Sequence, residues 1–275
     1  PGKTKGLTAR GNDMTLTKQQ RIAILLALFA VTLVGASFVP PIPQDPDYHQ
    51  FADMRPLWGI PNFGDTISNA GFLVVSLMGL WSLLGSRRRA IFTEGPDATP
   101  YAVFFTGVGL VAAGSAYYHL VPDTDRLFWD RLPMTVAFMA LFAAIVADRI
   151  DRPFGNRWLL PILVAIGIAS LLYWNWSEGQ GRGDLRWYAM VQFYPMLALP
   201  VICWLFPKSH YTGGGQLIWV IVWYGIAKVL EHFDGPVLAL LGGAVSGHSL
   251  KHLAAAIATY HVLRMVTGTP ERVGH

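Results

Sequence analysis

The feature that most constrains this chain is a series of long apolar segments that recurs along nearly its whole length. Such segments lie at about 22–40, 65–85, 101–121, 127–148, 157–175, 186–206, 216–234 and 247–267. A helix of about 20 mostly apolar residues is long enough to cross the hydrocarbon core of a bilayer. Only 14% of the residues are charged, against about 25% in an average soluble domain. The sequence therefore predicts an all-α, polytopic membrane helix bundle.

Three of these segments, 127–148, 216–234 and 247–267, are diluted by charged or histidine residues at one end. We keep them as spans because buried ionisable residues in membrane helices are rare and usually functional. The first segment, 22–40, also fits a signal peptide, since a basic front precedes its apolar run and small residues follow it. Its length favours a retained helix.

The expected organisation follows from these segments. Residues 1–13 precede Met14 and are interpreted as an expression remnant or a disordered tail. Residues 14–41 form an additional N-terminal transmembrane helix or a signal-like segment, and 42–64 a non-cytoplasmic loop. The remaining spans occupy 65–267, and 268–275 are a cytoplasmic tail. The loops between spans are too short to hold a soluble domain.

Lysine and arginine are distributed unevenly between the two sides of the expected bundle. With eight spans, one side receives fourteen of them and the other only five, which are Arg55, Arg126, Arg131, Arg182 and Arg186. Because cytoplasmic loops carry the excess of Lys and Arg, both termini are expected in the cytoplasm. The net charge of +4 comes without a basic and aromatic surface pattern, so nucleic acid is not an expected partner.

Polar residues gather at one end of the expected spans. Ser115 and His119 close segment 101–121, Asp130 opens the next segment, and His248 and His252 open the last one. Under the orientation just given, all five lie near the non-cytoplasmic face, although the charge count used none of them. This agreement favours a shared site at that face.

The histidine spacing suggests a metal. His248 and His252 are four residues apart, so they share one helix face, as in the H-x-x-x-H pairs of zinc proteases. Alone, such a pair in a membrane helix is more often packed or hydrogen-bonded than metal-binding. His119 would supply a third nitrogen and leave a position for water, which is typical of catalytic zinc. Asp130 could then act as general base, and Ser115 could donate a hydrogen bond to the water or the oxyanion.

These residues resemble a known family. The order S-x-x-x-H, Asp, H-x-x-x-H is similar to that of the membrane hydrolases that join alkaline ceramidases with the progestin and adiponectin receptors. Two stretches look like alkaline ceramidase motifs: NFGDTISNAGFLV (Asn62–Val74) contains a T-[IV]-S-N pattern, and DRLPM (Asp130–Met134) is similar to D-E-L-P-M. The resemblance spans about residues 60–267, which is nearly the whole membrane portion.

The resemblance implies a seven-helix catalytic membrane domain over 65–267, with helix 22–40 as an addition in front. It also implies one Zn²⁺ ion on His119, His248 and His252, with Ser115 and Asp130 engaging the zinc-bound water. The implied reaction is hydrolysis of the amide of ceramide, or of a similar N-acylated membrane lipid, to a fatty acid and a sphingosine-like amine.

The chain departs from the family at three places. Animal members carry a calcium site around an Asp-Trp pair, and this pair is absent here, where Asp53, Asn62 and Asp65 are the available ligands. A Ca²⁺ site is therefore doubtful. Arg131 replaces Glu in DRLPM, and Lys251 lies between the two histidines of the last segment. The amide-bearing substrate can accordingly differ from ceramide.

Further buried charges occur in the stretch AKVLEHFDG. Lys228 and Glu231 are three residues apart, and pairing would reduce the cost of burying either one. The alternative is that Glu231 or Asp234 hydrogen-bonds a ligand histidine from behind and fixes its tautomer. Lys251 is a third candidate for such a supporting contact.

The leading functional expectation is an intramembrane zinc amidase whose lipid substrate enters laterally between helices. The main alternative is a zinc-containing receptor or sensor of the progestin and adiponectin receptor type without efficient catalysis. A transporter with a proton path, or a retinal photoreceptor using Lys228 or Lys251, fits less of the pattern. The sequence does not indicate the oligomeric state.

Overall fold

The computed structural model describes residues 16–85, 92, 95–212 and 215–268. Within these ranges every regular element is helical, so the all-α prediction is confirmed. The expected tail at 1–13 and nearly all of the tail at 268–275 lie outside the described residues. So do residues 86–91, which contain three of the fourteen Lys and Arg residues counted for the cytoplasmic side.

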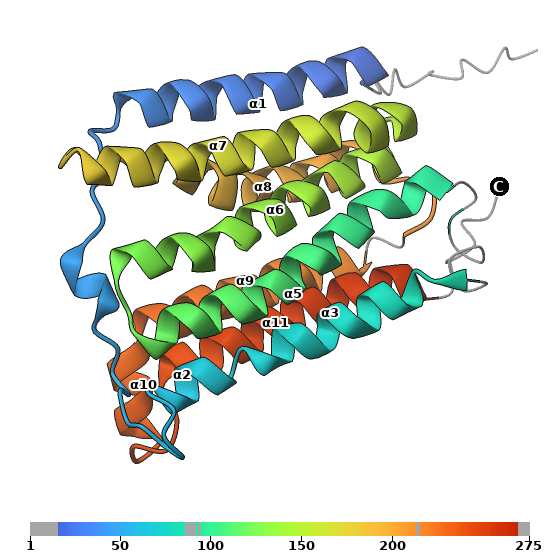
Figure 1. Ribbon diagram of the computed structural model, residues 1–275. Helices are drawn as coiled ribbons and strands as arrows, with labels where there is room; N and C mark the ends of the chain where they lie inside the picture. The colour runs from blue at the N-terminus through green and yellow to red at the C-terminus, as the bar shows by residue number, and fades with distance from the viewer. Residues whose placement is uncertain (1–15, 86–91, 93–94, 213–214, 269–275) are drawn as a thin grey trace, which may run out of the picture.

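The long helices lie side by side and roughly parallel or antiparallel in one bundle (Figure 1). In chain order the α-helices of the described residues, long and short, are α1 (Lys18–Phe38), α2 (Phe63–Ile67), α3 (Ala70–Ser82), α5 (Thr99–Leu120), α6 (Thr124–Arg149), α7 (Leu160–Gly179), α8 (Arg186–Leu205), α9 (Gly215–His232), α10 (Asp234–Leu240) and α11 (Gly247–Thr267). Short helical turns precede three of them, at Pro46–His49, Gly95–Ala98 and Phe154–Leu159.

Six described helices are long and apolar enough to cross a membrane. They are Lys18–Phe38, Phe63–Ser82, Gly95–Leu120, Thr124–Arg149, Phe154–Gly179 and Arg186–Leu205. This supports a membrane protein. Helices α9 and α11 do not belong to this set, in line with the polar residues that dilute them, but they pack closely against each other within the bundle.

Two N-caps place the polar residues at one end of the bundle. The Asp123 carboxylate accepts a hydrogen bond from the Arg126 backbone N–H (2.7 Å) and starts α6. The Ser246 hydroxyl accepts one from the Ser249 backbone N–H (2.9 Å) and starts α11. Such caps satisfy backbone donors that the first helical turn leaves free. They fix the register, so that Asp130 and His248 lie close to these helix starts.

Glycines allow the helices to approach closely at the same end. A Cβ atom on Gly114 of α5 would collide with the Trp129 carbonyl group of α6. A Cβ atom on Gly247 would likewise collide with the Leu230 carbonyl group of α9. The helix backbones therefore lie in direct contact beside Ser115 and His248, next to the polar residues.

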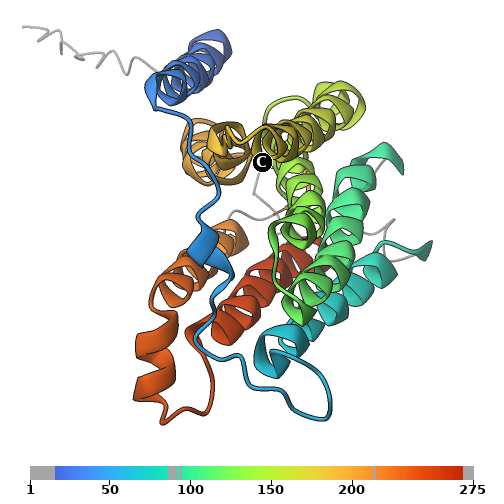
Figure 2. The same ribbon diagram turned by 60° about the vertical axis from the view of Figure 1, so that its left-hand side comes forward.

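Helix α1 stands apart from this arrangement. It lies at the edge of the bundle and contacts mainly α8 (Figure 2). None of its residues is buried. The expectation that this helix is an addition to the core is consistent with its position.

The linker between α1 and α2 crosses the end of the bundle where α5 ends and α6 and α11 begin (Figure 1). The Leu185 backbone N–H donates to the carbonyl oxygen of Ile42 (2.8 Å). Further along, the two ring nitrogens of His49 hydrogen-bond the hydroxyl groups of Tyr118 (2.9 Å) and Thr124 (3.1 Å). The linker thus covers this end of the bundle.

Candidate metal centre

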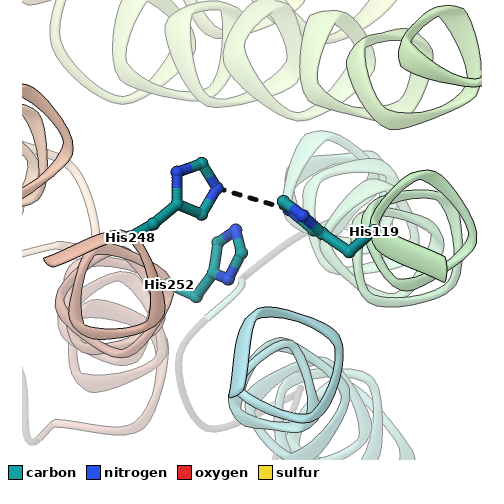
Figure 3. A group of neighbouring side chains, drawn as sticks. All are labelled: His119, His248 and His252. Carbon is teal, nitrogen blue, oxygen red and sulfur yellow. Dashed lines mark hydrogen bonds between the residues drawn. The ribbon is translucent and has the colours of Figure 1, made fainter. Parts of the chain in front are cut away.

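Three histidine side chains meet beneath the linker. His119 comes from the last turn of α5, whereas His248 and His252 come from the start of α11 (Figure 3). All three are buried, and each offers a ring nitrogen within 4.8 Å of those of the other two. The structure thus brings together the residues whose convergence the sequence predicts.

The spacing of the rings fits a shared metal ion. The Nε2 atoms of His119 and His248 lie 3.3 Å apart. Two nitrogen ligands at about 2.0–2.1 Å from a tetrahedral zinc ion would lie about 3.3–3.4 Å apart. The ring centre of His252 is 5.0 Å from each of the other two. Imidazole nitrogen is a preferred ligand of zinc, copper, iron and nickel, so the donor set fits a divalent ion of this group.

The ring of His252 is oriented by a serine. Its Nδ1 atom lies 2.8 Å from the Ser68 hydroxyl oxygen, which itself donates to the Asp65 carbonyl group (3.1 Å). With the proton on Nδ1, the Nδ1–H group donates to Ser68, and Nε2 is left with its lone pair free for a metal. Hydrogen bonds of this kind fix the tautomer of a ligand histidine.

The backbones of the other two histidines are also held. The Asn62 side-chain amide donates to the His119 carbonyl oxygen (2.7 Å). The Asp234 carboxylate accepts from the His248 backbone N–H (2.8 Å) and, with its other oxygen, from the backbone N–H of Ala52 in the linker (2.9 Å). These contacts join both histidine-bearing helices to the linker and to α10.

Asp130 and Ser115 interact with each other next to the two helices that carry the histidines. Ser115 is buried on α5, one turn before His119, and its hydroxyl group interacts with the half-buried Asp130 carboxylate of α6. That carboxylate also interacts electrostatically with Lys251 on α11. The structure therefore places the proposed base and its hydroxyl partner among the helices that carry the histidines.

The supporting roles predicted for Glu231, Asp234 and Lys251 differ from the observed contacts. Glu231 forms ion pairs with Lys228 (2.5 Å) and Lys251 (2.6 Å), and the described residues show no contact from it to an imidazole ring. Asp234 binds a backbone N–H group of His248 and not its ring. Glu231 therefore follows the ion-pair alternative, because each of its two carboxylate oxygens pairs with one lysine ammonium group.

Two further side chains shape the site without having been assigned a role from the sequence. One is Ser68, which lies in the T-I-S-N motif. This motif contributed to the family resemblance, but no role in the site was predicted for the serine. The other is Phe51 of the linker, whose ring centre is 4.7 Å from that of His119 and 4.4 Å from that of His248. This aromatic ring covers the histidines with an apolar surface. No local pattern could reveal it, because Phe51 lies about seventy residues from one histidine and two hundred from the other.

The residues considered for calcium have other partners. Asp53 forms a two-pronged ion pair with Arg55 (2.7 Å for both contacts), and this guanidinium group holds the pKa of Asp53 below its usual range. Asp65 accepts hydrogen bonds from the hydroxyl groups of Ser246 (3.1 Å) and Ser249 (2.6 Å). The Asp65 contacts tie α2 to the start of α11, and the bond from Asn62 to the His119 carbonyl group ties the linker to the end of α5.

Comparison of this chain with protein-family models, with curated proteins and with solved structures gave no match. The functional argument therefore depends on the chemistry of the site itself.

Proposed function

We propose that this protein is a membrane zinc hydrolase that cleaves the amide bond of an N-acylated lipid. The observation that carries the proposal is the convergence of three imidazole side chains, His119, His248 and His252, from two helices onto one point. The resemblance of the surrounding motifs to alkaline ceramidases supports the choice of an amide substrate.

Three imidazole ligands suit a catalytic metal site. Bound there, zinc would polarise a carbonyl group and lower the pKa of water to about 7. In the proposal, Asp130 accepts a proton from the attacking water and later returns it to the amine that leaves. Ser115 orients the Asp130 carboxylate by hydrogen bonding. Phe51 limits the access of bulk water to the imidazoles from the linker side.

An apolar cavity supports a lipid substrate. It has a volume of about 90 Å³ and lies between α3, α5, α6, α8, α9 and α11. Its lining includes Val111, Met134 and Ala255, which lie about one helical turn deeper than Ser115, Asp130 and His252, respectively. A cavity directly beneath the site suits the acyl carbon chain next to the scissile amide.

The proposal includes a seven-helix core and an orientation. In it α9 and α11 cross the membrane together with the five apolar spans that follow α1, and the histidine end faces the non-cytoplasmic side. The uneven distribution of Lys and Arg along the chain supports this orientation. A two-chain lipid rarely leaves the bilayer, so a site at membrane depth gives a hydrolase access to its substrate.

The test is release of fatty acid from defined lipids. Purified protein is incubated with ceramide and with other N-acylated lipids, and fatty acid is quantified by mass spectrometry for wild type, His248→Ala and His232→Ala. His232 is exposed at the end of α9 and serves as the matched histidine control. Release by wild type and His232→Ala but not by His248→Ala is expected. A metal-loaded wild type that releases no fatty acid from any acylated lipid would contradict the proposal and favour the receptor alternative.

A further inference from the structure

Arg131, the residue after Asp130 on α6, is a buried cation with no acidic hydrogen-bond partner among the described residues. Its side chain is held between three aromatic rings, with the guanidinium carbon 5.3 Å from the ring centre of Tyr48, 4.7 Å from that of Trp174 and 5.0 Å from that of Tyr188. These rings come from the linker, α7 and α8. Only 6% of the residue surface is accessible.

The aromatic rings do not satisfy the guanidinium group. It carries five N–H donors, and in the described structure its buried Nη1 atom has no hydrogen-bond partner. Cation–π contacts offset part of the cost of removing the charge from water, but a buried donor without an acceptor remains unfavourable. The arrangement is therefore incomplete until an acceptor is supplied.

The charges around Arg131 favour an anion as the missing hydrogen-bond acceptor of its guanidinium group. Lys228 and Lys251 both pair with Glu231. Asp130 interacts electrostatically with Arg131, but its hydroxyl partner is Ser115. Three cations thus face two carboxylates, before any metal charge is added.

Arg131 is linked to the start of α11 through Tyr48 and Glu231. The ring of Tyr48 that contacts the guanidinium group carries a hydroxyl that donates to the Glu231 carboxylate (3.5 Å). Glu231 in turn binds Lys251, which lies between the two histidines of α11. A substrate headgroup at Arg131 would therefore be adjacent to the residues that carry out the hydrolysis.

We propose that Arg131 binds a carboxylate on the amine part of the substrate, so that the preferred substrates are N-acyl amino acids and lipids with that headgroup. This inference rests on the proposed amidase function and deepens it. The planar fork of N–H groups on arginine matches the two oxygens of a carboxylate, which a neutral sphingosine headgroup does not provide. Hydrolysis would add water across the amide and give a fatty acid and a free amino acid.

The experiment compares N-palmitoylglycine with N-palmitoylethanolamine, in which an alcohol replaces the carboxylate. The variants are Arg131→Gln, Arg131→Lys and, as a control, Arg126→Gln. Arg126 lies on the same helix and also stacks on an aromatic ring, that of Tyr117, but it is more exposed. We expect wild type to favour the carboxylate substrate in kcat/KM by about tenfold or more, because charge-assisted hydrogen bonds contribute strongly at buried sites.

In Arg131→Gln, kcat/KM for N-palmitoylglycine is expected to fall by about ten- to a hundredfold, with the ethanolamide changed by less than about threefold. Arg131→Lys keeps the positive charge but loses the planar pair of N–H groups. Its kcat/KM for N-palmitoylglycine should therefore lie between the values of wild type and Arg131→Gln. Arg126→Gln should keep the preference of the wild type. A wild type that favours the neutral amide, or a preference unchanged in Arg131→Gln, would overturn the inference.

A binding measurement separates this inference from the proposed function. Hexadecylthioacetic acid and 2-(hexadecylthio)ethanol differ in the same carboxylate but contain no amide, and their binding can be followed by tryptophan fluorescence and by the shift in unfolding temperature. Wild type should bind the acid more tightly, and Arg131→Gln should bind both alike. If no amide is cleaved but this difference appears, the amidase proposal fails and the carboxylate site stands. Equal binding of the acid and the alcohol by wild type would refute the carboxylate site.

Discussion

Helices α1 and α11 show how differently two helices of one membrane protein can use their residues. Helix α1 contains the most apolar 18-residue stretch among the six candidate spans, yet none of its residues is buried. Helix α11 is too polar to belong to that set, but it buries His248, Ser249 and His252 at its start. Lipid solvates apolar side chains as well as a protein core does. High hydropathy alone therefore does not identify the helices that lie in the core of the bundle.

The comparison teaches that burial of polar groups, and not hydropathy, locates the site. The buried hydroxyl and imidazole groups at the start of α11 hydrogen-bond with Asp65 of α2 and with Ser68 just after it, and Lys251 pairs with Glu231 of α9. The side-chain hydroxyls of α1, by contrast, bond within their own helix. Polar groups in a membrane helix are costly to keep without a function. We therefore expect changes near α11 to affect activity and metal binding, and changes in α1 to affect neither.

The largest effect is expected from Asp130→Asn. The amide cannot accept the proton from water, so turnover should fall by about 10²- to 10⁴-fold while metal content stays unchanged. The readouts are steady-state kinetics and metal analysis of the same preparation. Asp125→Asn, an exposed carboxylate in the first turn of the same helix, should keep full activity. Comparable loss in both variants would remove Asp130 from the mechanism.

A smaller effect is expected from Ser68→Ala, which removes the partner of His252 Nδ1. Loss of such a supporting hydrogen bond typically weakens metal affinity by about 10- to 100-fold. Competition with a chelator measures this affinity. Ser37→Ala is the matched change in α1, where the hydroxyl donates to the Leu33 carbonyl group of its own helix, and it should leave metal affinity unchanged. Equal affinities in the two variants would argue against the tautomer role of Ser68.

A pair of apolar truncations tests the packing side of the comparison. Val262 of α11 is fully buried, whereas Leu26 of α1 is 63% exposed. Val262→Ala should destabilise the protein by about 1–2 kcal/mol through lost van der Waals contacts, and Leu26→Ala by less than about 0.5 kcal/mol. Unfolding in detergent or bicelles measures both. A larger cost for the change in α1 would mean that α1 is packed against more than lipid.

The smallest effect is expected from pH, through His49 of the linker. Burial lowers the pKa of His49 below its ordinary value of 6.5, so the docked linker favours the neutral ring. The contribution of His49 to docking is therefore present above pH 6.5 and is lost as the pH falls through the ordinary and then the lowered pKa. After correction for the slower intrinsic exchange of amides at acid pH, the protection of residues 39–62 from hydrogen exchange should be about two- to fivefold lower at pH 5 than at pH 7.5. In His49→Gln this pH dependence should be weaker, and an unchanged dependence would assign it to another group.

The sequence allowed part of this structure to be predicted, and the limits have physical causes. The length of an apolar segment and the i, i+4 spacing of two residues can both be read from a short stretch of sequence. The helices and the pair His248 and His252 could therefore be predicted directly. The convergence with His119 followed from the ends of the expected spans. By contrast, Phe51 reaches the site only because the linker folds across the bundle, and the choice of Lys251 over a histidine as the partner of Glu231 depends on side-chain directions. Helix α10 was not expected, because it occupies only seven residues.

The central claim is that three imidazoles from α5 and α11 hold one metal ion. The most direct measurement is the metal content of protein purified after expression with zinc, by elemental analysis and native mass spectrometry, for wild type and for His119→Ala, His248→Ala and His252→Ala. His261→Gln is the control, since this residue of α11 hydrogen-bonds Gln216 (2.8 Å). We predict one zinc ion per chain in wild type and in His261→Gln, and loss of it in each of the other three variants. Wild type without a bound metal ion, or alanine variants that keep one, would contradict the account.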